Sequence, residues 1–146
     1  MQGGQFQFKL DKANLIKAGT IPVILAAVGG LLWILGFLGG LLGILFWAVA
    51  LFAGYWYVNL VLKSGATPTI VDIAINGAIL GAAVGLAYGL GEFIGQTITP
   101  CVSFFGVAAS CANFGKVISE LFSGAVGGAI GAAGWFAYKS GMFKTK

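Results

Sequence analysis

The sequence contains no histidine and no arginine, and it has only four acidic residues among 146. Histidine is the commonest metal ligand and titrates near neutral pH, and arginine is the usual bidentate clamp for phosphate. The serines have no base to activate them, and the glycine-rich stretches lack the strand–loop–helix setting of a phosphate-binding motif. We therefore expect no enzyme activity, no catalytic, cofactor-binding or metal-binding residues, no nucleic-acid partner and no small-molecule substrate.

Charge of either sign is scarce as well. Charged residues make up 8% of the chain and hydrophobic residues 59%, whereas about a quarter of an ordinary soluble domain is charged. The mean hydropathy is +0.98. So few charges cannot cover a globule of 15.0 kDa in water. The lipid bilayer is therefore the expected partner, and residues 1–146 are expected to form one membrane domain.

The uncharged segments of the first half predict two spans. No residue from Ala18 to Leu62 is charged, a run of 45 residues. As a single helix, this run would be about 67 Å long, roughly twice the ~30 Å hydrocarbon core. The chain must therefore reverse, and the glycine-rich segment 36–43 is the predicted turn. Helices are expected near 20–38 and 42–62.

The second half predicts two further spans. A polar segment with a proline at 64–69 separates them from the first pair, 19 uncharged residues run from Ile73 to Gly91, and Glu120 to Tyr138 follows. The predicted fold is all-α and polytopic, with four transmembrane helices in two hairpins. The expected parts are a cytoplasmic or interfacial segment 1–19, a first hairpin 20–62, an inner loop 63–71, a second hairpin 72–138 with an outer loop 97–115, and a basic tail 139–146.

The lysines predict the orientation. With four spans, seven of the eight lysines lie on one side and only Lys116 lies on the other. Positive charge favours the cytoplasmic side of a membrane, so both termini are expected to be cytoplasmic, in a cell membrane or a virion membrane. Aromatic residues that approach the same side support this orientation: Tyr55, Trp56, Tyr57, Trp135 and Tyr138. Asp11 is expected to cap a short helix that lies along the inner interface.

Glycine spacing is the strongest local pattern. Small residues on one ridge let transmembrane helices approach closely, so we predict glycine-zipper packing of the third and fourth helices. The residues concerned are Gly77, Gly81, Gly85 and Gly89, and then Gly124, Gly127, Gly128, Gly131 and Gly134. This face could pack two spans of one chain, join subunits, or line a pore with backbone.

A carboxyl group near a span is the clearest functional candidate. Glu92 lies twenty residues after Asp72, about 30 Å along a helix, which places it at the outer boundary. We expect a polar cluster there that comprises Glu92, Gln96, Lys116 and Glu120. The alternative is a proton or cation site at Glu92.

Two cysteines fall on the predicted outer side. Cys101 and Cys111 are candidates for a disulfide bridge in an oxidising compartment, and two free thiols are the alternative. A metal site is not expected, because two cysteines without histidine leave it short of ligands.

The distribution of polar groups favours a structural role. A conducting path needs polar groups at several depths, but between Gly77 and Gly91 the only polar side chain is that of Tyr88. We expect a structural membrane protein, either a subunit of a larger membrane assembly or a self-associating membrane or virion-envelope protein. Its partners would be further copies or other membrane subunits. The alternative is a small channel, a holin-like pore or an ion-coupled transporter that uses Glu92.

Overall fold

The described parts of the chain are entirely helical. The structure, a computed structural model, describes residues 9–35, 39–98 and 112–142, and it has no strand within these ranges. The elements are α1 (Lys12–Leu31), the 3-10 turn η1 (Leu32–Leu35), α2 (Gly39–Lys63), α3 (Ile70–Ile98) and α4 (Phe114–Lys139). All four α-helices are long and apolar enough to cross a membrane. The prediction of an all-helical chain with four helices able to span a membrane is therefore confirmed.

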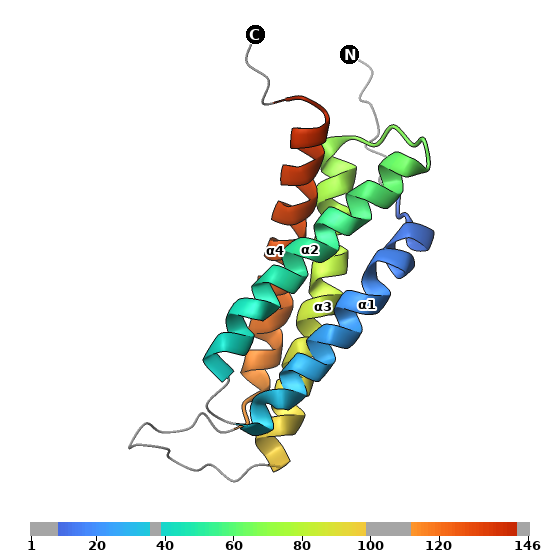
Figure 1. The fold of residues 1–146 in the computed structure, drawn as a ribbon. Coiled ribbons are helices and arrows are strands. Elements are labelled where there is room, and N and C mark those ends of the chain that lie inside the picture. Colours follow the sequence, from blue (N-terminus) through green and yellow to red (C-terminus); the bar gives the residue numbers. More distant parts are fainter. Residues whose placement is uncertain (1–8, 36–38, 99–111, 143–146) are drawn as a thin grey trace, which may run out of the picture.

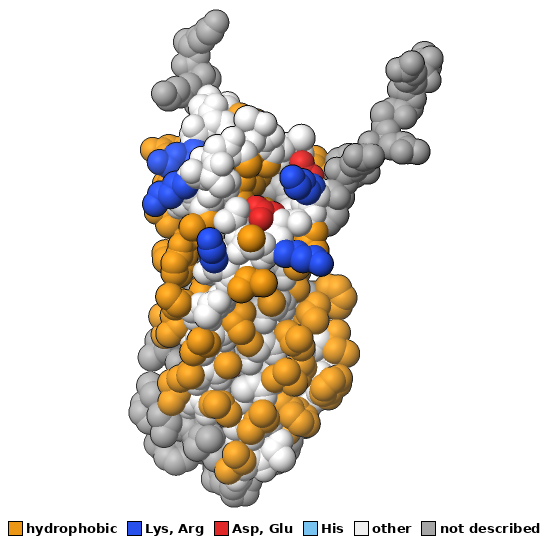
Figure 2. Space-filling model, turned by 90° about the vertical axis from the view of Figure 1, so that its right-hand side faces the viewer, with side chains coloured by type: hydrophobic (Ala, Val, Ile, Leu, Met, Phe, Trp, Pro, Cys, Tyr) orange, Lys and Arg blue, Asp and Glu red, His pale blue; other side chains and the backbone are white. Residues whose placement is uncertain are grey.

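The four helices form a bundle with two chemically different ends (Figure 1). At one end α1 begins, α2 passes into α3, and α4 ends; we call it the lysine end, after Lys9, Lys12, Lys17, Lys63 and Lys139. At the other end α1 passes into η1, α3 ends and α4 begins; we call it the Glu92 end. Figure 2 shows lysine and acidic side chains gathered toward the lysine end, above a largely apolar face.

Polar caps begin three of the helices. Asp11 caps α1 by accepting a hydrogen bond from the Asn14 backbone N–H at 3.3 Å, as predicted. However, α1 continues from this cap to Leu31, so the expected interfacial helix and the first span are one helix that begins well before residue 20. Hydropathy placed the start too late because it registers the apolar residues and not the cap. Thr69 and Asp72 cap α3 reciprocally, and Asn113 caps α4.

Helix α3 makes the most extensive contacts with the other helices of the bundle. It packs most extensively against α4, while α1 packs chiefly on α3 and α2 chiefly on α4. The consecutive helices α1 and α2 touch each other less than either touches its main partner. Neighbours in sequence are therefore not the main packing partners in the first half.

Helices α3 and α4 meet backbone to backbone. An alanine Cβ at Gly81 would overlap the carbonyl oxygen of Gly124, and one at Gly85 would overlap the carbonyl oxygen of Glu120. Added carbon atoms at Gly124 and Gly128 would overlap α3 in turn. We call this contact the α3–α4 glycine seam; its glycines are Gly77, Gly81, Gly85, Gly89, Gly124 and Gly128.

The remaining glycines of α4 serve other purposes. A Cβ at Gly131 would lie 2.5 Å from the carbonyl oxygen of Leu51 on α2, and one at Gly127 would lie 3.2 Å from the Ala50 Cβ. A Cβ at Gly134 would meet nothing within 4 Å. Gly127 and Gly131 therefore face α2, whereas Gly134 faces away from the other described helices of the chain. Regular spacing identifies small residues, but it does not say which side of a helix is covered.

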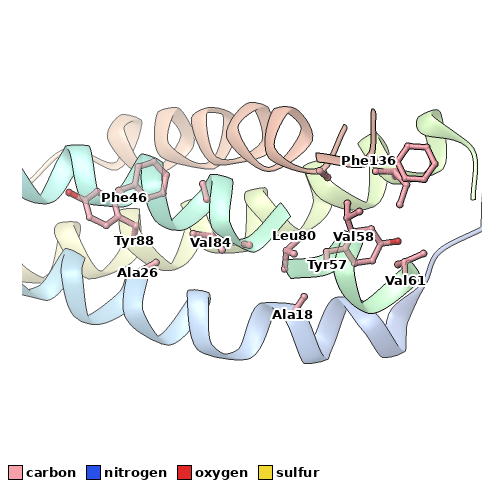
Figure 3. Packing of buried hydrophobic residues seen from close by; sticks show 14 residues of the cluster. Ala18, Ala26, Phe46, Tyr57, Val58, Val61, Leu80, Val84, Tyr88 and Phe136 are labelled. Carbon is pink, nitrogen blue, oxygen red and sulfur yellow. The ribbon is translucent and has the colours of Figure 1, made fainter. Parts of the chain in front are cut away.

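Apolar side chains fill the rest of the interior (Figure 3). The rings of Phe46 and Tyr88 stack with centroids 4.6 Å apart, which joins α2 to α3. The buried cluster comprises Ala18, Ala26, Phe46, Ala50, Ala53, Tyr57, Val58, Val61, Ile73, Leu80, Val84, Tyr88, Ala132 and Phe136. Outward faces carry large apolar residues, such as Phe122, Val126 and Ile130 on α4, as lipid contact requires.

Candidate functional site

An ion pair between the buried Glu92 and the partly exposed Lys116 joins α3 to α4 at the Glu92 end. Glu92 lies near the end of α3 and is 2% exposed. Its Oε1 accepts hydrogen bonds from Lys116 Nζ at 2.5 Å and from Gln96 Nε2 at 2.7 Å. Gln96 follows Glu92 by one turn on the same helix, so both donors converge on one carboxylate oxygen. Three of the four residues in the predicted polar cluster are therefore in direct contact.

An aromatic residue on η1 completes this cluster. Lys116 Nζ lies 4.9 Å from the ring centroid of Trp33, within the range of a cation–π contact. The Trp33 Nε1 donates a hydrogen bond to the Tyr88 hydroxyl at 2.8 Å. The network thus connects η1, α3 and α4. The sequence does not indicate a role for Trp33, because nothing in the spacing of residues places it beside Lys116.

Glycines bring α1 against α3 directly beside the ion pair. A Cβ at Gly91 would lie 2.5 Å from the Ala27 carbonyl oxygen, and one at Gly30 would overlap the Tyr88 carbonyl oxygen. The backbone of α1 therefore covers the part of α3 that carries Glu92. This close approach explains how a carboxylate can be almost fully buried near the end of a helix.

The fourth predicted member, Glu120, does not join the hydrogen-bonded network. It lies one turn after Lys116 on α4 and is partly exposed. Within the described ranges its carboxylate makes no hydrogen bond or ion pair. Its backbone has a packing role instead, since its carbonyl oxygen faces Gly85.

The polar groups of this cluster satisfy one another. The charge of Glu92 is balanced by Lys116, whose side chain is 38% exposed, and its hydrogen bonds are satisfied by two donors. In the described ranges no three residues of metal-ligating type come together. The contacts of this cluster connect three helical elements, η1, α3 and α4.

A second polar contact lies at the lysine end, around Asn76 on α3. This side chain is 1% exposed. Its Oδ1 accepts a hydrogen bond from the Asp11 backbone N–H at 3.2 Å, and its Nδ2 donates to the carbonyl oxygens of Lys9 at 3.2 Å and Asp72 at 2.9 Å. Asn76 therefore holds the backbone that leads into α1 against α3. All of its hydrogen-bond partners are backbone groups, and the segment that leads into α1 covers the Asn76 side chain.

Aromatic residues of α2 and α4 also meet at the lysine end. The ring of Trp135 lies 4.7 Å from that of Tyr55 and 5.2 Å from that of Tyr138, centroid to centroid. Trp135 Nε1 donates to Asn59 Oδ1 at 3.3 Å, and Lys139 Nζ lies 5.1 Å from the Trp135 centroid. Tyr55, Trp135 and Tyr138 thus form one cluster across two helices. Tyr57, which was predicted with them, is instead buried in the core of the bundle.

The two cysteines lie outside the described residues. Cys101 and Cys111 fall in the range 99–111, so the proposed bridge stays a prediction.

Comparison of the chain with protein-family models, with curated proteins and with solved structures finds no match.

Proposed function

We propose that the protein is a non-enzymatic structural membrane protein. It would serve as a helical subunit of a larger membrane assembly, or as a self-associating component of a cell or virion membrane. Its partners would be lipid, further copies of the chain or other membrane subunits.

The apolar character of the buried face of α3 supports this proposal. Its buried polar side chains, Asn76, Glu92 and Gln96, all belong to the two ends of the helix. Asn76 and Glu92 are separated by about 24 Å at 1.5 Å per residue. Between them the buried positions are apolar or glycine, apart from Tyr88, whose hydroxyl accepts a hydrogen bond from Trp33 near the Glu92 end. A conducting path requires polar groups at successive depths, and the described interior offers none through this stretch.

We further propose that the α3–α4 glycine seam acts as a glycine zipper within one chain and holds the two helices of the second hairpin together. Close backbone approach stabilises helix pairs in lipid through dispersion and favourable packing. Because the glycines of the seam face each other inside the bundle, subunit contacts would have to use the outward apolar faces. The lysine end would face the cytoplasm, since lysines favour that side.

Native mass spectrometry after gentle detergent extraction tests the structural role. We expect either a regular assembly of many copies or a complex with other membrane chains, each identified from the same sample. A monomer or a small closed oligomer that conducts ions in vesicles would contradict it.

One observation favours the second candidate, an ion-coupled transporter or small channel. Glu92 is a buried carboxylate in a span, and such groups often mark ion or proton pathways. Glu92→Gln removes the charge and keeps the shape of the side chain, so it would abolish ion flux in a transporter. For a structural protein we expect wild-type and variant vesicles to be equally impermeable, with assembly unchanged.

A further inference from the structure

At the lysine end, the acidic side chains have hydrogen-bond partners, whereas the lysines have no acidic partner among the described residues. Two aspartates lie there, and each is engaged in capping a helix: Asp11 accepts from both nitrogens of Asn14, and Asp72 accepts from Thr69. The lysines of this end are all exposed: Lys9, Lys12, Lys17, Lys63 and Lys139. The only ion pair in the described part of the chain is at the opposite end. Five ammonium groups therefore have no carboxylate partner among the described residues.

Large apolar side chains are exposed directly next to these lysines. Ile16 is 69% exposed beside Lys17, Leu62 is 37% exposed beside Lys63, and Tyr138 is 62% exposed beside Lys139. A nucleic acid or an acidic soluble protein would leave these apolar groups in water. A lipid leaflet offers both environments, because its anionic phosphates lie at the edge of its hydrocarbon layer. Lysine side chains can extend from an apolar surface to such a boundary.

The aromatic cluster of Tyr55, Trp135 and Tyr138 lies at the same end of the bundle as these lysines. Tryptophan and tyrosine are enriched at the headgroup region of membranes, and Trp135 and Tyr138 lie against Lys139. Lysine ammonium groups and interfacial rings thus occur together at one end of the bundle. At the Glu92 end the one described lysine is already paired with Glu92.

We propose that the lysine end is a binding surface for the headgroups of anionic phospholipids. The exposed lysines contact lipid phosphates, and the adjacent apolar side chains contact the acyl chains of the same lipids. The preference is electrostatic, so it depends on charge and not on the shape of the lysine side chain.

Native mass spectrometry of the full chain measures this preference directly. The protein is released from micelles that contain equimolar phosphatidylglycerol and phosphatidylcholine with identical acyl chains. A lysine near an anionic surface contributes about a fivefold change in binding, and neighbouring lysines share the effect. We therefore expect at least about tenfold more phosphatidylglycerol than phosphatidylcholine bound to the wild type. Equal binding of the two lipids would overturn the proposal.

Variants separate charge from folding. Replacing Lys9, Lys12, Lys17, Lys63 and Lys139 with glutamine should lower the preference at least about fivefold, and replacing the same five with arginine should keep it. Lys116→Gln, at the other end, should also keep it. Helix content by circular dichroism identifies a misfolded variant. An unchanged preference in a folded glutamine variant would overturn the proposal.

Two measurements on the wild type need no variant. The preference should fall as sodium chloride is raised, because exposed charges are screened by salt; a preference insensitive to salt would overturn the proposal. Inorganic phosphate should not displace the lipid at equal concentration, since it lacks acyl chains. Displacement at equal concentration would show a site for free phosphate and overturn the lipid assignment.

Discussion

The α3–α4 contact differs from the contacts by which α1 and α2 join the bundle. Along the α3–α4 glycine seam, small residues recur at several levels and keep the two backbones together over successive turns. Helix α1 meets the α3 backbone most closely where Gly30 crosses Gly91, and α2 meets α4 most closely where Gly54 and Gly131 lie. One contact is an extended seam, and the others are short crossings.

This difference shows what selects helix partners in a bilayer. Lipid tails are as apolar as leucine, so burial of apolar surface by itself favours no particular pair. Close approach of backbones does discriminate, because only glycine and other small residues permit it. The most extensive contact accordingly forms where glycines recur on both helices.

The largest effect is expected from breaking the seam itself. Gly85→Leu places a side chain where even a Cβ would overlap the Glu120 carbonyl oxygen, so α3 and α4 must separate. We expect a loss of at least about 4 kcal/mol in the free energy of unfolding, a size that only a few mechanisms produce. Unfolding in sodium dodecyl sulphate, followed by circular dichroism, measures it.

Gly134→Leu is the matched control for that variant. A Cβ at Gly134 meets nothing within 4 Å, and leucine has a higher helix propensity than glycine by up to ~1 kcal/mol. We expect stability equal to the wild type or slightly higher. Equal losses in the two variants would refute the importance of the seam.

A smaller effect is expected at the α1–α3 crossing. Gly30→Leu obstructs one contact between α1 and α3 and leaves the α3–α4 seam intact. Overpacking of this kind typically costs about 1–3 kcal/mol. Hydrogen exchange should show faster exchange in α1 than in the wild type, with α3 and α4 still protected. Uniform deprotection of all four helices would mean that the crossing matters as much as the seam.

Removing the Lys116 ammonium group should lower the free energy of unfolding by less than breaking the α3–α4 glycine seam does. Lys116→Ala leaves the buried Glu92 carboxylate with Gln96 as its remaining donor. Breaking a fully buried pair costs about 3–5 kcal/mol. Since Lys116 is 38% exposed, we expect about half of that, or about 2 kcal/mol.

Glu92→Gln is the comparison for that variant, because it leaves no buried charge and lets Lys116 turn toward solvent. Its loss of stability should be smaller, within about 1 kcal/mol of the wild type. If Glu92→Gln were the more damaging of the two changes, Glu92 would have a role beyond the ion pair.

A local effect is expected at Asn76. Asn76→Ala removes the bonds that hold the backbone of Lys9 and Asp11 to α3. The expected cost is about 1–2 kcal/mol, since the partly buried Asp11 backbone N–H then loses its partner. Amide exchange in the first turn of α1 should accelerate, while the far end of α1 stays protected. Unchanged exchange near Lys12 would contradict the attachment.

Much of the molecule could be predicted from the sequence, and the errors share a cause. The four spans, the cap at Asp11 and the grouping of Glu92 with Gln96 and Lys116 follow from charge gaps, capping chemistry and helix length. The start of α1, the open position of Gly134 and the roles of Trp33 and Asn76 do not. Each of these depends on which side of a helix meets which neighbour.

The sequence by itself determined that the chain has four segments long and apolar enough to cross a membrane, and that its charged residues lie toward the ends of these segments. Composition and the cost of burying charge in hydrocarbon suffice for those conclusions. Only the tertiary structure decided that α1 packs on α3 and α2 on α4, that the α3–α4 glycines face each other, and that Lys116 reaches both Glu92 and Trp33. The apolar residues leave little difference between the sides of each helix, so the rotation and partner of a helix are set by the fit of shapes in three dimensions.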